Sequence, residues 1–417
     1  MREMKDSGIE WIGAIPTTWH TKKMKYISNF IQNKYSSDYG LLPYIGLENI
    51  ASWSGSFIST NSQYDREQSL ICQPEDILFG KLRPYLAKVY MNDRLCCCSN
   101  EFAVIRVNGQ NKRYMWYQLL SHGFIFEIDR STYGTKMPRA NAEFIRNVFV
   151  ALPSEIEQQK IANYLDKMCA EIDAVLEKTR ASIEEYKKLK QAFITQAVTK
   201  GIRGDRPMKN SGIEWIGDIP AEWNKDKVIR VFSVIGSGTT PKSSDENLFD
   251  GNTPWIQSGD INGENLFVTK NCVSNSAIES YSALRVYQAP YLVVAMYGAS
   301  VGNLSLSMID ACVNQACCVL KKPTINLKFS FYIFKAVKDY LARKAVGGGQ
   351  PNISQETIKQ LWLPIPSADE QIEISNYLDE KCRSVDALIA KKQQYLTEIE
   401  NYKKSLIYEY VTGKKEA

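Results

Sequence analysis

One seven-residue segment, Ser-Gly-Ile-Glu-Trp-Ile-Gly, occurs twice in this chain, at residues 7–13 and again at residues 211–217. The match continues beyond it, because IEWIGAIPTTW aligns with IEWIGDIPAEW at a constant offset of 204 residues (211 − 7 = 204). A second identical segment, NYLD, begins at Asn163 and at Asn376, an offset of 213 residues (376 − 163 = 213). The chain is therefore an internal repeat, and its second copy carries a net insertion of nine residues (213 − 204 = 9).

Between these matches the two copies resemble each other only weakly. YIGLENI (residues 44–50) aligns with WIQSGDI (residues 255–261), and DILFGKLRPYLAK (residues 76–88) aligns with YLVVAMYGASVGN (residues 291–303). The ends of each copy are thus nearly constant, whereas the middles have diverged. This pattern is typical of common scaffolding around two different binding surfaces.

A long helix is predicted at the end of each copy. Apolar residues recur at steps of three and four between Ile161 and Ala197 and, at the offset of 213, between Ile374 and Tyr410. Such spacing is typical of a coiled-coil seam. The first helix is about 60 Å long at 1.5 Å per residue, longer than a small domain. Because the only other long helix is its own repeat, we expect the two helices to pair, antiparallel.

The ends of these helices carry their own signals. Ser154 and Ser367 are predicted N-caps, and Glu157 and Glu370 follow three residues later, as in a capping box. Gly201 suits the end of the first helix, and the segment after it indicates a linker.

Each diverged middle is predicted to be a compact α+β domain. Short β-rich segments alternate with Gly-, Ser- and Asn-rich connections. One helix is expected in each middle, at about residues 114–122 and 329–343. The predicted strands are ILFGKL, KVYMND, FAVIRV and FVALP in the first copy, and YLVVAMYG, ACCVLKK and LWLPIP in the second.

Composition limits the function classes. Hydrophobic residues make up 44% of the chain and charged residues 23%, as in soluble globular proteins. No apolar run approaches the roughly 20 residues that span a bilayer, and the N-terminus lacks a signal-peptide core, so we expect a cytoplasmic protein. The net charge of +5 is a weak indication of a polyanionic partner.

The ten cysteines indicate neither disulfides nor a metal site. Residues 96–98 and 317–318 are contiguous cysteines, no C-x-x-C pair exists, and the only histidines are His20 and His122. Metal sites need spaced thiolates and imidazoles that converge on one point. We therefore expect reduced cysteines that act as small apolar residues in strands.

No catalytic motif is evident in the sequence. GSGTTPKS (residues 236–243) resembles a phosphate-binding loop, but Pro241 stands where that motif requires glycine before the lysine. Adenine-methyltransferase motifs and a defensible nuclease cluster are also missing. We therefore expect no catalysis in this chain, and we keep two alternatives open: a two-headed protein-binding scaffold without a DNA role, and a fused enzyme whose site is hidden among scattered carboxylates.

The order of divergent domain, long helix, divergent domain and long helix resembles the specificity subunit of type I restriction–modification systems. Both copies share the entry segment SGIEWIG…IP..W. Both also carry a G…P…I stretch, GTKMPRANAEFI and GGGQPNISQETI, and a similar helix opening, LPSEIEQQKIANYLD and PIPSADEQIEISNYLD. The loops FGKLRPYL and MYGASVGN also resemble those of the family. The resemblance covers essentially the whole chain.

This resemblance implies an α+β fold with two globular target recognition domains, separated by a pair of long antiparallel coiled-coil helices and related by an internal pseudo-two-fold repeat. Each domain reads one half of a bipartite double-stranded DNA target, and the helices dock two modification (methyltransferase) subunits. The domains are expected at residues 1–153 and 211–366, the helices at 154–201 and 367–413, and the linker at 202–210.

The same resemblance places catalysis and S-adenosylmethionine in the partner subunits, with no cofactor or metal in this chain and no membrane partner. Whether restriction subunits accompany it is left open. Arginine and lysine side chains can bond guanine edges or phosphates, and amides can bond adenine edges. We therefore predict DNA contacts from the loops of the divergent middles, namely Lys81, Arg83, Tyr85, Lys88, Lys136, Arg139, Tyr297, Ser300, Asn303, Gln350 and Asn352. Trp11 and Trp215 are expected to be packed framework residues.

Overall fold

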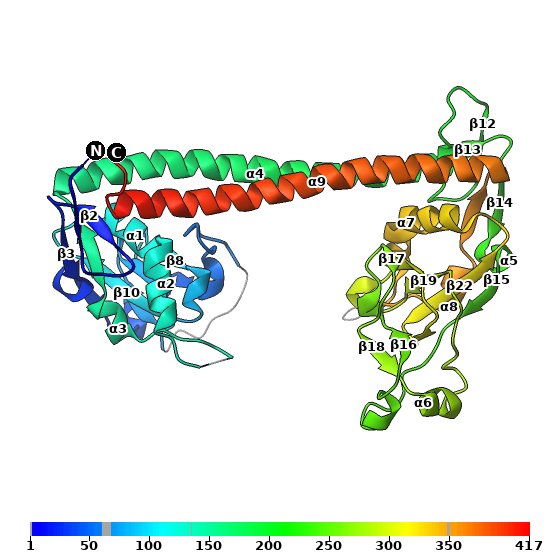
Figure 1. Cartoon of the computed structure of the whole chain (residues 1–417), viewed down its shortest axis with the longest axis horizontal. Helices are drawn as coiled ribbons and strands as arrows, with labels where there is room; N and C mark the ends of the chain where they lie inside the picture. Colours follow the sequence, from blue (N-terminus) through cyan, green and yellow to red (C-terminus); the bar gives the residue numbers. More distant parts are fainter. Residues whose placement is uncertain (1, 61–67, 135, 348–350) are drawn as a thin grey trace. The chain divides into compact units, whose positions relative to one another are not determined.

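The computed structural model describes residues 2–60, 68–134, 136–347 and 351–417. It divides into two compact units, residues 1–180 with 393–417 and residues 181–392 (Figure 1). Each unit contains one globular part and a portion of both long helices, α4 (Glu155–Lys200) and α9 (Ala368–Val411). The domain limits given by the sequence stay a prediction, and each unit is described by itself.

The first unit is built around a sheet in the order β4–β10–β7–β8. Its strand β10 (Phe102–Val107) is buried at every position except Arg106, which is half-buried. Because successive side chains of a strand point to opposite faces, both faces of β10 are covered. Further strands form the sheet β5–β9–β6 and the pairs β1–β2 and β3–β11. The strands are β1 (Met4–Asp6), β2 (Ala14–Pro16), β3 (His20–Lys23), β4 (Ser28–Ile31), β5 (Tyr44–Ile45), β6 (Leu70–Cys72), β7 (Ile77–Gly80), β8 (Val89–Met91), β9 (Cys96–Cys98), β10 and β11 (Phe149–Leu152).

The expectation of a single helix in the first middle is wrong. Two helices follow β10, α1 (Lys112–Leu120) and α2 (His122–Arg130), and a short α3 (Ala142–Asn147) comes later. The break lies at Ser121, whose backbone is extended and whose hydroxyl accepts a hydrogen bond from the Phe124 amide at 3.4 Å. Serine thus acts as an N-cap that starts a second helix where the apolar pattern alone runs on.

The second unit repeats this plan. Its main sheet has the order β15–β22–β19–β20–β17, and every residue of β19 (Tyr291–Ala295) is buried. The predicted helix is α7 (Leu327–Lys344). The other strands form the sheet β18–β16–β21 and the pairs β12–β13 and β14–β23. The remaining elements are β12 (Met208–Asn210), β13 (Asp218–Pro220), β14 (Asn224–Lys227), α5 (Val228–Val231), β15 (Phe232–Gly236), β16 (Thr253–Ile256), β17 (Asn265–Leu266), β18 (Asn271–Val273), α6 (Asn275–Ser280), β20 (Leu304–Ser307), β21 (Cys312–Val313), β22 (Cys317–Pro323), α8 (Gln355–Lys359) and β23 (Trp362–Ile365).

The two long helices pair antiparallel within each unit. In the first unit the Lys403 ammonium lies 2.6 Å from the Asp173 carboxylate. In the second unit Lys190 and Asp386, the residues 213 positions away, form the same ion pair at 2.6 Å. The apolar seam is narrower than predicted, because some of its positions, related in pairs by the offset of 213, are exposed. These positions are Val175, Leu388, Leu189 and Tyr402.

The repeated heptapeptide is the closed loop of a β-hairpin. In the first copy it joins β1 to β2, and in the second copy it joins β12 to β13. Gly8 and Gly13 have φ values of 70° and 69°, and Gly212 and Gly217 have φ values of 69° and 67°. Only glycine adopts this left-handed conformation without steric cost, so the loop tolerates little change in its sequence.

The cysteines occupy the interior, as expected. Cys96–Cys98 form β9 and are fully buried, and Cys317 and Cys318 are buried in β22. Burial raises the pKa of the Cys317 thiol. All the cysteines are free thiols, and only Cys272 is partly exposed. Within the described ranges, no group of His, Cys, Asp or Glu side chains is arranged to hold a metal ion. Over those same ranges, no helix has the length and apolar character to cross a bilayer.

Candidate nucleic-acid interface

Two loops that are far apart in the sequence meet in the first unit. The loop between β7 and β8 is joined to the segment before α3 by backbone hydrogen bonds. The Arg83 amide donates to the Pro138 carbonyl at 2.7 Å, and the Ala140 amide donates to the Lys81 carbonyl at 2.9 Å. Leu82 also forms a bridge with Arg139. All six predicted contact residues of the first copy therefore lie on two connected loops.

The backbone of the first loop is strained at two residues. Arg83 and Ala87 have φ values of 51° and 47°, in the left-handed region that residues with a Cβ rarely adopt. They flank a turn of 3₁₀ helix, Pro84–Leu86, that carries Tyr85. Tyr85 is 45% exposed, so it is not a core residue. Strain of this kind persists where the surrounding structure fixes it and is frequent at functional sites.

The cations of the first unit differ in how free they are. Lys88 Nζ donates to the Leu47 carbonyl at 2.6 Å, and burial lowers the pKa of Lys88. Burial also lowers the pKa of Lys81, which is half-buried. Arg139 forms an ion pair with Glu101. Arg83 and Lys136 are exposed, and no carboxylate among the described residues pairs with either. These two residues are the most available for an anionic ligand.

The second unit holds its loops with the same hydrogen bonds. The Gly298 amide donates to the Pro351 carbonyl at 2.8 Å, and the Ile353 amide donates to the Met296 carbonyl at 2.9 Å. Tyr297 bridges to Asn352, as Leu82 bridges to Arg139. The two units therefore present one loop frame with different side chains.

The predicted residues of the second unit fall on this frame. Tyr297 is 45% exposed and Asn352 is exposed. The Ser300 hydroxyl donates to the Tyr297 carbonyl at 3.1 Å, and the Asn303 amide approaches the Ile261 carbonyl at 3.4 Å. Gln350 lies outside the described residues. The role of each predicted residue in DNA binding stays a prediction.

The frame contains residues that the sequence reasoning missed. Tyr133 is 63% exposed and bridges to Arg139, and Val346, at the offset of 213, is 69% exposed and bridges to Asn352. The available signal was that offset, which relates these positions in the same way as it relates Arg139 and Asn352. The two candidate tryptophans are framework, as expected: Trp11 is buried against Phe124, and the Trp215 ring donates to the Trp362 carbonyl at 3.2 Å.

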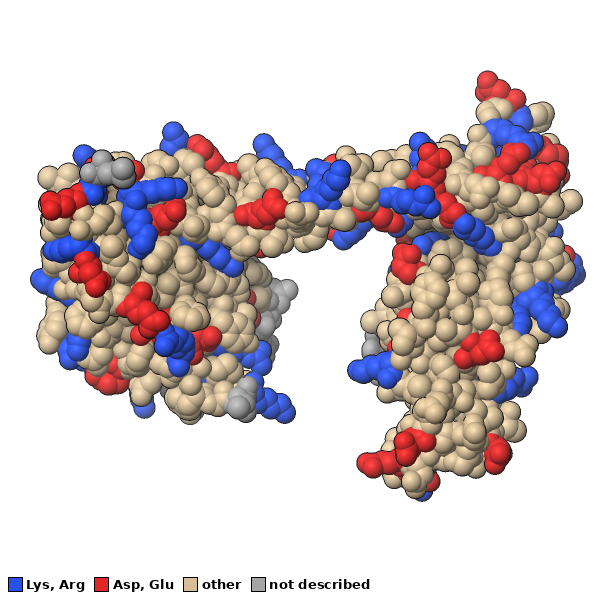
Figure 2. Space-filling view, in the orientation of Figure 1, with Lys and Arg blue, Asp and Glu red and all other residues tan. Residues whose placement is uncertain are grey.

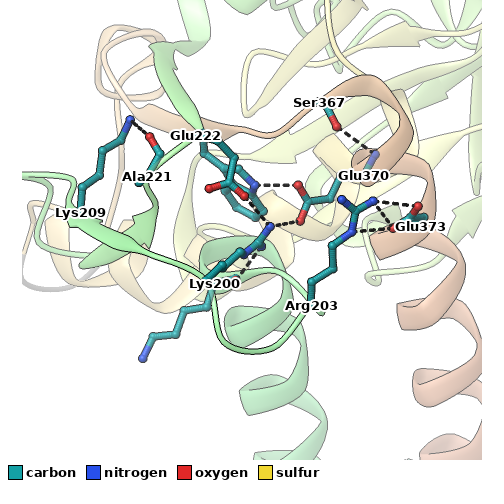
Figure 3. Close-up of polar contacts among 10 residues, drawn as sticks. Lys200, Arg203, Lys209, Ala221, Glu222, Ser367, Glu370 and Glu373 are labelled. Atoms are coloured by element: carbon teal, nitrogen blue, oxygen red, sulfur yellow. Dashed lines mark hydrogen bonds and ion pairs between the residues drawn. The ribbon is translucent and has the colours of Figure 1, made fainter.

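A second missed feature explains why the ends of each copy are constant. The Trp223 ring nitrogen donates to Glu370 at the start of α9 at 2.8 Å, and Arg206 forms an ion pair with Glu370 at 2.6 Å. Figure 3 shows Glu370 there, beside the more exposed pair of Arg203 and Glu373. In the first copy Trp19 bonds Glu157 at 3.1 Å, and Arg2 pairs with Glu157 at 2.5 Å. The repeated segment thus ties each globular part to its helix.

Both capping serines also behave alike. The Glu157 amide donates to the Ser154 hydroxyl, and the Glu370 amide donates to the Ser367 hydroxyl, each at 3.4 Å. The glutamate side chains turn to the tryptophans, in place of the reciprocal bond that a capping box has.

Charges of both signs are interspersed over the visible face of the molecule, and uncharged surface separates them (Figure 2). Extended single-sign fields are absent from this face, as the modest net charge of +5 implies. An anionic partner would therefore be recognised by local groups, such as Arg83 and Lys136, more than by the field of the whole protein.

Comparison with known proteins decides the family. The sequence model of the family described as "Type I restriction modification DNA specificity domain" matches residues 16–185 and, a second time, residues 220–401. This chain belongs to that family of type I specificity subunits. The two matches coincide with the two copies of the repeat, so each copy is one DNA specificity domain.

Relatives with this name include proteins from distant organisms. The type I restriction enzyme EcoBI specificity subunit of Escherichia coli is 20% identical over 444 residues, which cover 99% of this chain and 89% of that protein. The MjaVIII specificity subunit of Methanocaldococcus jannaschii is 24% identical, over 75% of this chain and 73% of that protein.

Solved structures of specificity subunits share the fold. A chain from a structure on complex assembly and conformational transition of the type I R-M system aligns with a TM-score of 0.75 at 17% identity, over 95% of this chain and 98% of that one. The HsdS subunit from Thermoanaerobacter tengcongensis aligns with a TM-score of 0.51, also at 17% identity, over 96% of this chain and 98% of that subunit.

Proposed function

We propose that this specificity subunit binds double-stranded DNA at a bipartite target, with each globular part reading one half-site. The observation that carries the proposal is the pair of equivalent loop frames. The Arg83–Pro138 and Gly298–Pro351 bonds hold the same backbone in both units, yet the side chains on it differ. One frame with two unlike surfaces suits a protein that reads two unlike sequences in the same way.

The proposed contacts are the predicted loop residues, with Arg83, Tyr85 and Asn352 as the exposed members nearest the bridges between the loops. Side chains on such loops read base edges in the major groove, whereas most basic residues hold phosphates. The identical heptapeptides carry no sequence information in this proposal, because they serve the framework in both copies.

We propose that the subunit is not catalytic and that methyl transfer occurs in partner modification subunits, which supply S-adenosylmethionine. Two such subunits dock on the long helices, once for each copy of the repeat. The paired ion bridges Lys403–Asp173 and Lys190–Asp386 support a two-fold arrangement of equivalent docking surfaces. With DNA as the target, the place of action is the cytoplasm.

The proposal is tested with the subunit co-purified with its modification subunits. Methylated motifs found by sequencing source-cell DNA supply the target, and fluorescence anisotropy compares that duplex with duplexes in which one half-site is scrambled. We expect each scrambled half-site to weaken binding, and the affinity to fall as the salt concentration rises.

A protein-binding scaffold without a DNA role would give equal affinity for target and scrambled duplexes, and that outcome would overturn the proposal. Methyl transfer by the isolated chain in the presence of S-adenosylmethionine would contradict the non-catalytic assignment.

A further inference from the structure

The two loop frames can be matched residue by residue. Besides the bonds of Arg83 and Gly298, the Gly80 amide donates to the Lys88 carbonyl at 2.9 Å, and the Ala295 amide donates to the Asn303 carbonyl at 2.8 Å. Four positions of the first frame therefore have a counterpart fixed by backbone hydrogen bonds or bridges. The pairs are Lys81 with Met296, Arg83 with Gly298, Lys88 with Asn303, and Arg139 with Asn352.

All four positions are cationic in the first unit and uncharged in the second. The acidic partner changes with them, because Glu101, which pairs with Arg139, aligns with the neutral Gln315 at an offset of 214. Gln315 accepts a hydrogen bond from the Thr240 hydroxyl at 2.5 Å. The ion pair of one frame is thus replaced as a whole by neutral polar groups in the other.

The exposed group nearest the bridges also differs between the frames. In the first unit it is the Arg83 guanidinium, aimed by a left-handed backbone that the bond to Pro138 fixes. In the second unit a glycine takes that position, and the exposed polar side chain is the amide of Asn352. A guanidinium matches the two acceptors of guanine, and a carboxamide matches the donor and acceptor of adenine.

We propose that the two readers use opposite chemistry on one frame. The first reads a guanine through Arg83 and holds its half-site by ionic contacts, whereas the second reads an adenine through Asn352 and adjacent neutral groups. This inference rests on the proposed function.

The test uses the complex of the full subunit with its modification subunits and duplexes that carry 7-deazaguanine or 7-deazaadenine, which lack the N7 acceptor. We expect 7-deazaguanine in the first half-site to weaken wild-type binding about tenfold and to have no further effect on Arg83→Ala, since each variant removes the same contact. In the second half-site, 7-deazaadenine is expected to weaken wild-type binding and to have no further effect on Asn352→Ala.

Each variant is the control for the other. Arg83→Ala should keep its full sensitivity to 7-deazaadenine, and Asn352→Ala should keep its full sensitivity to 7-deazaguanine. Salt dependence gives an independent reading: Lys136→Ala should lower the slope of log K against log salt by about 0.9, whereas Asn352→Ala should leave the slope unchanged.

Lys338 provides a stringent check, because it is an exposed cation on α7 whose backbone carbonyl lies under Gly302 of the second frame. Lys338→Ala should leave sensitivity to both modified bases unchanged. The inference is overturned if Arg83→Ala weakens all duplexes equally, or if the first half-site shows no sensitivity to 7-deazaguanine. If the complex shows no preference for target over scrambled DNA, the proposed function itself fails, which is a different result.

Discussion

Replacing Glu370 with alanine tests how each globular part is fastened to its helix. The Glu370 side chain is 3% exposed and its partner Arg206 is 11% exposed. Removal of one member of a buried ion pair leaves an uncompensated buried charge, which costs about 3–5 kcal/mol. Because Arg206 keeps its contact with Glu222 at 3.0 Å, we expect the lower end, about 3 kcal/mol. The loss of the Trp223 hydrogen bond acts in the same direction.

The chain offers a matched control one turn further along the same helix. Glu373 pairs with Arg203, but these side chains are 48% and 53% exposed, and exposed pairs contribute about 0–1 kcal/mol. Urea titration of the full subunit, followed by far-ultraviolet circular dichroism, should rank the alanine variants at Glu370, Glu157 and Glu373 in order of decreasing loss. Glu157 falls between the others because it is 22% exposed. Equal midpoints for the Glu370 and Glu373 variants would refute the reasoning.

Other changes have equally definite expected outcomes. Arg83→Ala should weaken binding to the target duplex by about 1–3 kcal/mol if Arg83 reads a base, and a loss that is equal for all sequences in anisotropy assays would make it a phosphate contact. Removing one heptad from α4 and the facing heptad from α9 should shift the preferred gap between half-sites by up to about three base pairs, since seven helical residues span about 10 Å; an unchanged gap in a spacer series would contradict a measuring role for the helices. In the native protein a maleimide reagent should label Cys272 well before the buried cysteines, because burial withholds the reactive thiolate; mass spectrometry that finds early labelling at Cys317 would contradict this order.

Much of the fold could be predicted because it is written in local patterns. The predicted strands ILFGKL, FAVIRV and YLVVAMYG contain β7, β10 and β19, and the seam predicted the antiparallel helix pair. The break at Ser121 could not be predicted, because α1 and α2 share one apolar run and only the extended backbone of the serine separates them.

The candidate site was predictable as a set of residues and not as an assembly. Loop composition selected Arg83 and Arg139, but nothing local indicates that the Arg83 amide meets Pro138, because that contact joins segments more than 50 residues apart. The fastening of Trp223 to Glu370 was missed although its signal existed, since Trp19 and Glu157 repeat it at the two offsets already measured. A pair of offsets read together predicts such contacts.

The central claim is that two unlike readers on one repeated frame select a bipartite DNA target. Sequencing of methylated DNA from the source cell, with and without the gene for this subunit, tests it most directly. The account predicts a motif of two different half-sites with a fixed gap, methylated on opposite strands and lost when the gene is deleted. A set of methylated motifs that the deletion leaves unchanged, or the loss of a single uninterrupted motif, would contradict it.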